Sequence, residues 1–189
     1  MSSGYLTNPV AFLVDALIGL YILALMLRFL LAWVRADFYN PVSQFLVRVT
    51  NPVLVPLRRV LPSAGGIDSA SLVLMLGLQM AALAIVASLR GASLPLASLL
   101  FLALAELLGL LLNVFLFAIF IQVILSWINP GTYNPVASLL HSLTEPVLRP
   151  CRRLLPPIGG MDLSPIIALL AIQVLKMLLL PPLRQLALG

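Results

Sequence analysis

The chain of 189 residues has few charged residues, one cysteine and one histidine. Only 9% of its residues are charged, whereas 62% are hydrophobic. A soluble domain carries about a quarter charged residues, so this composition excludes a soluble enzyme and a disordered tail. A single cysteine also excludes a small secreted domain held by intrachain disulfides. We therefore expect an integral membrane protein.

Ligands for metals and groups for covalent catalysis are equally scarce. Cys151 and His141 alone do not supply a zinc or haem site. On its helix His141 has only Ser138 and Ser142 nearby, which is a weak arrangement for an activated nucleophile. The sequence contains no phosphate-binding glycine loop. We expect no cofactor, no metal and no enzymatic activity.

Four apolar stretches are each about long enough to cross ~30 Å of hydrocarbon. They comprise residues 10–34, 69–89, 96–128 and 163–180. Because none alternates apolar and polar residues, each is expected to cross as a helix. The third is longer than a span requires, so we expect it to tilt or to begin along the interface. The fold class is therefore all-α, with four transmembrane helices.

Basic residues are distributed unevenly between the connections. The connections between spans one and two and between spans three and four hold Arg35, Arg48, Arg58, Arg59, Arg149, Arg152 and Arg153. The opposite side has only Arg90 and Arg184. Since arginine and lysine favour the cytoplasmic side, this bias predicts that both termini lie outside and that both basic connections lie in the cytoplasm. The N-terminal segment has no lysine or arginine, and we expect the first span to be a retained anchor.

Shifting the chain by 94 residues superposes its two halves without an insertion. Trp33 then falls on Trp127, and Asn40-Pro41 falls on Asn134-Pro135. The same shift aligns Arg58-Arg59, Gly65-Gly66 and Asp68 with Arg152-Arg153, Gly159-Gly160 and Asp162. We infer two repeats, residues 1–94 and 95–189. Each holds two spans, so the repeats are predicted to be parallel, related by an axis along the membrane normal.

Each segment between paired spans has the same predicted local structure. Asn40 and Asn134 stand at N-cap positions, and Pro41 and Pro135 at the first helical positions. An amphipathic helix of about ten residues should follow at the cytoplasmic interface. Prolines 52, 56, 62, 146, 150 and 156 then predict an irregular segment, either interfacial or re-entrant. Turns at Gly65, Gly66, Gly159 and Gly160 should lead to Asp68 and Asp162, where the next spans begin.

The second copy carries a recognisable motif. From Thr144 to Pro165 it reads Thr-Glu-Pro-x-Leu-x-Pro-x-Arg-Arg-x-x-Pro-x-x-Gly-Gly-x-Asp-x-Ser-Pro, which resembles the signature of the YggT family. The first copy departs from it, with Asn51 in place of the glutamate. The resemblance implies an integral inner-membrane protein without an established catalytic activity. Family members are associated with tolerance of osmotic stress and ion imbalance, with organisation near the division site or nucleoid, and with cytochrome maturation in plastids.

Several polar residues lie within the predicted spans, where their burial is costly. We expect Lys176 to pair with Glu106 or Asp15, as a structural contact or as part of an ion pathway. Arg28 is expected to reach the headgroups or to contact free carbonyls of the proline-rich segment. The remaining members of this intramembrane polar network are Gln122, which aligns with Arg28, and Gln79 and Gln173, which should bridge helices.

The paired arginines 58, 59, 152 and 153 are candidate sites for anionic headgroups or a protein partner. Glu145 is expected to cap a helix or to assist that binding. We therefore expect a non-catalytic scaffold or assembly factor whose basic cytoplasmic face binds anionic phospholipid or a membrane protein and supports osmotic tolerance. It could form a homo-oligomer and is not expected to bind nucleic acid. The alternative is a small transporter or channel component involved in ion balance.

Overall fold

The computed structural model describes residues 3–61, 68–128, 134–154 and 162–188. These ranges form six helices and no strand: α1 (Ser3–Trp33), α2 (Pro41–Val60), α3 (Ser69–Leu89), α4 (Leu96–Ile128), α5 (Pro135–Leu154) and α6 (Ser164–Leu188). Helices α1, α3, α4 and α6 are long and apolar enough to cross a membrane. The protein is therefore an all-helical, multi-pass membrane protein with four spans, as the sequence predicts.

The spanning helices differ from the predicted spans mainly at the chain ends. The bounds of α3 and α4 match the prediction, whereas α6 continues beyond residue 180 through Pro181 and Pro182. A proline removes only one backbone donor, so a helix can continue past it with a local bend. At 1.5 Å per residue, the 33 residues of α4 extend about 50 Å. This length exceeds the hydrocarbon thickness, so α4 tilts or extends into the headgroup region.

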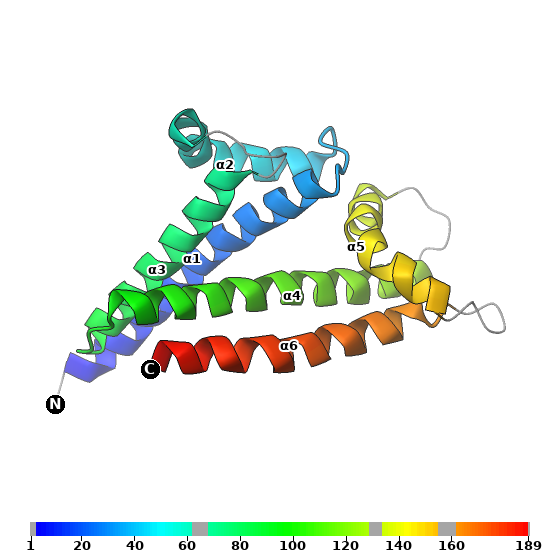
Figure 1. Cartoon of the computed structure of the whole chain (residues 1–189). Helices are drawn as coiled ribbons and strands as arrows, with labels where there is room; N and C mark the ends of the chain where they lie inside the picture. Colours follow the sequence, from blue (N-terminus) through cyan, green and yellow to red (C-terminus); the bar gives the residue numbers. More distant parts are fainter. Residues whose placement is uncertain (1–2, 62–67, 129–133, 155–161, 189) are drawn as a thin grey trace.

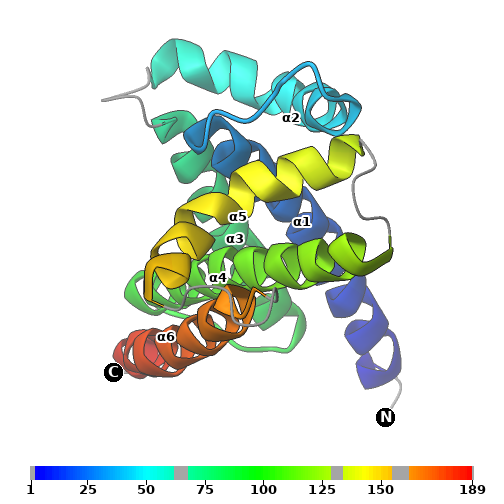
Figure 2. The same cartoon turned by 90° about the vertical axis from the view of Figure 1, so that its right-hand side faces the viewer.

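The helices form two closely packed pairs, α1 with α3 and α4 with α6 (Figure 1). Both chain termini lie at one end of the molecule, and α2 and α5 lie crosswise towards the opposite end (Figures 1 and 2). We call the end that carries α2 and α5 the basic end. The parallel relation of the repeats, their axis and their bounds at residues 1–94 and 95–189 stay predictions.

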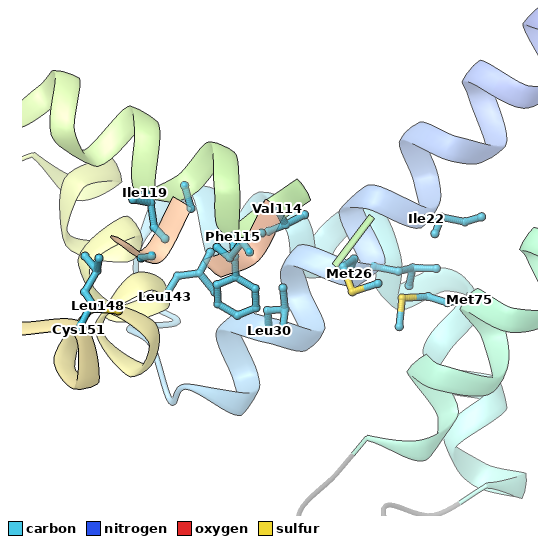
Figure 3. Close-up of a cluster of buried hydrophobic side chains, with 14 of the residues drawn as sticks. Ile22, Met26, Leu30, Met75, Val114, Phe115, Ile119, Leu143, Leu148 and Cys151 are labelled. Atoms are coloured by element: carbon cyan, nitrogen blue, oxygen red, sulfur yellow. The ribbon is translucent and has the colours of Figure 1, made fainter. Parts of the chain in front are cut away.

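One apolar core joins the two halves. Buried side chains from α1, α3, α4 and α5 meet in it, and Phe115 of α4 points towards Leu30 of α1 and Leu143 of α5 (Figure 3). The other labelled members are Ile22, Met26, Met75, Val114, Ile119, Leu148 and Cys151. Because α5 of the second half contributes to this core beside α1 of the first, the basic end is packed onto the spans.

The helices α2 and α5 correct one prediction. Each continues as a single helix through two prolines, Pro52 and Pro56 in α2 and Pro146 and Pro150 in α5. The expected irregular segment after ten residues is therefore wrong up to Val60 and Leu154. Ser43, Leu46, Thr50 and Leu54 form one continuous buried row along α2, so packing holds the helix together past the missing donors. Whether these helices are interfacial or re-entrant stays a prediction.

Candidate functional site

The N-termini of α2 and α5 are capped alike. The Asn40 side-chain oxygen accepts a hydrogen bond from the Val42 amide at 3.0 Å, and Asn134 does the same for Val136 at 2.9 Å. These are the N-caps that the sequence predicts. Asn40 has a second role, since its side-chain nitrogen donates to the Pro135 carbonyl oxygen at 2.7 Å. This bond joins the start of α2 to the start of α5 across the two halves.

The C-terminal turn of each crosswise helix is tied to the following span. Arg58 of α2 forms an ion pair with Asp68, and Arg152 of α5 forms one with Asp162 at 3.0 Å. Each aspartate also accepts a hydrogen bond from a backbone amide in the first turn of the next helix, at Ser71 and Ser164. We call each Arg–Asp pair a clasp. The glycine pairs at 65–66 and 159–160 lie outside the described residues.

The clasps change the acidity of their carboxyl groups. Partial burial raises the pKa of Asp68, but hydrogen bonds from Arg58 and Ser71 and the charge of Arg58 outweigh it. Burial likewise raises the pKa of Asp162, and hydrogen bonding by Ser164 and Arg152 outweighs it. The net pKa of both groups lies below the ordinary value for aspartate, so both are ionised at neutral pH.

Glu145 belongs to the second clasp. Its carboxylate lies 2.7 Å from one guanidinium nitrogen of Arg152, while Asp162 contacts another nitrogen of the same group. The expected capping role is wrong, because α5 begins at Pro135 and Glu145 stands in the middle of the helix. Asn51 occupies the aligned position in the first half, so only the second clasp has two carboxylates.

Arg28 does not extend to the headgroups. It is 7% exposed and donates to the Thr50 hydroxyl oxygen at 2.5 Å, while Thr50 donates to the Leu46 carbonyl. The expected headgroup contact is therefore wrong, and so is the alternative contact with free carbonyls, since the acceptor is a hydroxyl. In the second half, Thr144 donates to Gln122 at the aligned positions. Both threonines are fully buried.

Thr50 and Thr144 are not among the residues predicted from the sequence to be functional. Thr50 and Thr144 align at the 94-residue shift, and each lies among the apolar residues of an amphipathic helix. The repeated hydroxyl on the apolar side of the helix could have identified them, because a buried hydroxyl requires a hydrogen-bond partner. The partner in each half is the polar residue of the adjacent span.

Between the spans α4 and α6, the predicted pairing of Lys176 is wrong. Lys176 donates to the Asn113 side-chain oxygen at 2.7 Å, whereas Glu106 pairs with Arg184 at 3.1 Å. Arg184 is available because α6 continues past Pro181 and Pro182. Asn113 was missed, although an amide inside a long apolar helix is itself a sign of an interhelical hydrogen bond. Asp15 is exposed and forms no ion pair within the described ranges.

Gln79 and Gln173 do not bridge helices in the described part of the chain. Gln173 is exposed on α6 and Gln79 is half-buried on α3, and neither makes a side-chain hydrogen bond there. The polar bridge that the sequence predicts at these positions is therefore not present among the described residues.

Besides Arg58, the crosswise helices carry four exposed arginines: Arg48, Arg59, Arg149 and Arg153. Within the described ranges none of them enters an ion pair. Around Arg48 lies an open hollow of about 510 Å³, lined by Phe38, Gln44, Val47, Arg48 and Asn51. Each predicted arginine pair is thus divided: Arg58 and Arg152 are held in clasps, whereas Arg59 and Arg153 lie outside any described ion pair.

Known proteins resemble the chain over most of its length. The CCB3/YggT family model matches twice, at residues 7–89 and 101–183, and both ends of the two matches are offset by 94 residues. An uncharacterised protein of Pseudomonas aeruginosa is 47% identical over 177 residues, covering 93% of this chain and 90% of the relative. The uncharacterised YggT protein of Escherichia coli K12 is 42% identical over 171 residues, covering 90% and 88%. A protein of Vibrio alginolyticus is 40% identical over 169 residues, covering 88% and 90%.

No solved structure matches the chain. The two family matches fit the two repeats read from the sequence, and the relatives align over nearly their whole length. The chain therefore belongs to the CCB3/YggT family.

Proposed function

We propose that the protein is a non-catalytic membrane organising factor whose basic end binds the headgroups of anionic phospholipids. The observation that carries this proposal is the position of Arg48, Arg59, Arg149 and Arg153. All four are exposed, outside any described ion pair, and located on the two helices that lie towards one end. A basic residue near an anionic membrane surface contributes about 1 kcal/mol of attraction.

The hollow around Arg48 is the most specific part of this surface. The Arg48 guanidinium and the side-chain amides of Gln44 and Asn51 are hydrogen-bond donors on its wall. Guanidinium groups bind phosphate oxygens through two parallel hydrogen bonds. Phe38 and Val47 complete the wall with apolar surface. A phosphodiester headgroup with the upper part of an acyl chain has the matching chemistry.

The clasps support this site indirectly. Because Asp68 and Asp162 neutralise Arg58 and Arg152, those two arginines fix the crosswise helices to the spans. The exposed arginines are then presented in one orientation by helices that are tied at both ends. This arrangement suits a stable surface that gathers lipid or positions other membrane components.

Orientation follows from the same charges. We place the protein in the bacterial inner membrane, with both termini outside and the basic end at the cytoplasmic surface, where basic connections are favoured. An organising role at this surface would support tolerance of osmotic stress, in which tension and lipid packing change.

The chain offers a direct test, because it has only two tryptophans. Trp33 and Trp127 are exposed near the ends of α1 and α4 that lead to the crosswise helices. Quenching of their fluorescence by brominated phosphatidylglycerol, compared with brominated phosphatidylcholine, measures lipid preference at the basic end. We expect the wild type to prefer phosphatidylglycerol, and replacement of the four exposed arginines by alanine to reduce that preference about tenfold or more.

Arg90→Ala is the matched control, since Arg90 is exposed and follows α3 near the opposite end. It should leave the preference unchanged. Equal quenching by the two lipids in the wild type contradicts the proposal. A wild type without lipid preference that instead retains one defined protein, lost in the four-arginine variant, indicates a protein partner.

The alternative function is a small transporter or channel component. The side chains that would serve it, Lys176, Glu106 and Arg28, bind Asn113, Arg184 and Thr50 respectively. These contacts support a structural role. Ion flux in vesicles containing the purified protein, abolished by Lys176→Met with assembly intact, would favour transport.

A further inference from the structure

The two halves do not bury the same surfaces. On α5, Leu139 is 5% exposed and Leu143 is 3% exposed. The aligned residues on α2 are Phe45, which is 62% exposed, and Val49, which is half-buried. A side of α5 that is packed in the second half is therefore open on α2 in the first half.

The cover over α5 comes from the first half of the same chain. Leu139 packs in a cluster with Leu31 and Ala36, and Leu27 and Val34 contact this cluster from the end of α1. The hydrogen bond from the Asn40 side chain to the Pro135 carbonyl lies at the same junction. We call this contact between the end of α1 and the side of α5 the internal junction.

The second half also has the covering surface, and within the described ranges it is partly exposed. At the 94-residue shift, Leu27, Leu31 and Val34 align with Ile121, Leu125 and Ile128 near the end of α4. Ile121 is 42% exposed and Ile128 is 66% exposed. The chain thus forms this junction once, between α1 and α5. The equivalent surfaces on α4 and α2 are both exposed in the described part of the chain.

The polar part of the junction is unfilled as well. Asn134 aligns with Asn40, and its oxygen caps α5 in the same way, but its side-chain nitrogen has no partner in the described part of the chain. The acceptor that aligns with the Pro135 carbonyl is the carbonyl of Pro41, an exposed residue at the start of α2. Donor and acceptor are both present, on different halves of one molecule.

We propose that a second copy of this chain completes the junction. The end of α4 in one copy packs on the Phe45 side of α2 in the other, and the Asn134 side chain donates to the Pro41 carbonyl of that copy. In a two-fold dimer the end of α4 of each copy contacts α2 of the other, so the contact is isologous and closes. The dimer would be an arrangement of four repeats.

Lipid is the competing cover for exposed apolar residues in a membrane protein. Acyl chains are as apolar as leucine, so helix association there depends on close packing and polar contacts. The internal junction supplies both, with known residues, for the same surfaces in the same chain. The exposed surfaces of α2 and α4 can therefore pack on each other as their aligned counterparts do. The Asn134 side-chain nitrogen, which has no partner in the described part of the chain, favours this contact over lipid.

Cysteine cross-linking in the membrane tests this proposal, in a Cys151→Ser background. Val34→Cys with Leu139→Cys in one chain probes the internal junction and should give an intrachain disulfide under mild oxidation. Ile128→Cys and Phe45→Cys, carried by two differently tagged copies in one cell, occupy the aligned positions between copies. We expect a mixed dimer that requires both cysteines, at a yield similar to that of the internal pair.

Ile166→Cys replaces Ile128→Cys in the matched control, because Ile166 is also exposed and lies in the first turn of α6. It should give only background dimer with Phe45→Cys. The proposal is overturned if the internal pair forms while the pair between copies gives no more dimer than this control. Absence of the internal disulfide also overturns it, since the junction used as its template would not exist.

The mass of the purified protein gives an independent readout. We expect a dimer for the wild type in mild detergent, and a dissociation constant raised about tenfold or more by Phe45→Asn. Asn134→Asp keeps the capping oxygen and removes the donor, so it should also weaken the dimer. An unchanged tryptophan spectrum establishes that each variant is folded. A monomeric wild type, or variants that dimerise like the wild type, would contradict the proposal.

Discussion

At the scale of single residues, two specific polar pairs connect the spans to the crosswise helices. Arg28 with Thr50 and Gln122 with Thr144 link a span to a crosswise helix in each half. The two contacts differ in charge, since the first involves a guanidinium and the second a neutral amide. A buried donor that loses its partner is costly, and the cost is larger for a charged group.

Replacement of each threonine by valine removes the hydroxyl at nearly constant shape. Thr50→Val leaves Arg28 buried and unpaired, so we expect a loss of about 2 kcal/mol in unfolding free energy. Thr144→Val should cost about 1 kcal/mol, because its partner is neutral. Reversible unfolding in mixed micelles measures both. Equal effects of the two substitutions would refute the assigned role of Arg28.

These residues also mark the limit of what the sequence could predict. A charge within an apolar span identifies Arg28 as important, but its partner is 22 residues away and depends on how α2 packs against α1. The sequence predicts the wrong partner for Lys176 for a related reason. The end of α6 was placed before Pro181, which put Arg184 beyond the helix and made Glu106 available to Lys176.

At the scale of elements, α2 and α5 combine a packed side with an exposed basic side. The N-caps and the four spans follow from short-range patterns, so the sequence predicts them correctly. The continuation of α2 and α5 through their prolines cannot be predicted from such patterns, because it depends on packing against the spans. Which arginine of each pair forms the clasp likewise depends on where the following aspartate lies in the folded protein.

The clasps should make stability depend on pH. The folded pKa of Asp68 and Asp162 lies below the unfolded value of about 3.9. Their contribution is therefore fully present above about pH 4 and is lost as the pH falls through the folded pKa. We expect the unfolding free energy to fall below pH 4, and to fall less in the double variant Asp68→Asn, Asp162→Asn.

Asparagine retains the side-chain oxygen that caps the next helix, so this variant isolates the ion pairs. It should also be less stable than the wild type at pH 7, because Arg58 and Arg152 lose their counter-ions. A double variant with the same pH profile as the wild type would show that the clasps do not stabilise the protein.

At the scale of the whole molecule, the repeat produces two similar halves with different surroundings. Both termini lie at the end away from α2 and α5 (Figure 1). In the proposed orientation this end faces outwards. An alkaline phosphatase fused after Gly189 should be active in cells, and one fused after Leu154 should be inactive. The reverse pattern would place the basic end outside and remove it from the cytoplasmic leaflet.

The central claim is that the basic end binds anionic headgroups, and native mass spectrometry of the purified protein tests it most directly. Micelles containing equal amounts of phosphatidylglycerol and phosphatidylcholine allow the two lipids to compete for the protein. We predict that the wild type and Arg90→Ala retain phosphatidylglycerol, and that the variant lacking Arg48, Arg59, Arg149 and Arg153 retains neither lipid preferentially. Retention of phosphatidylglycerol by that variant at the wild-type level would contradict the claim.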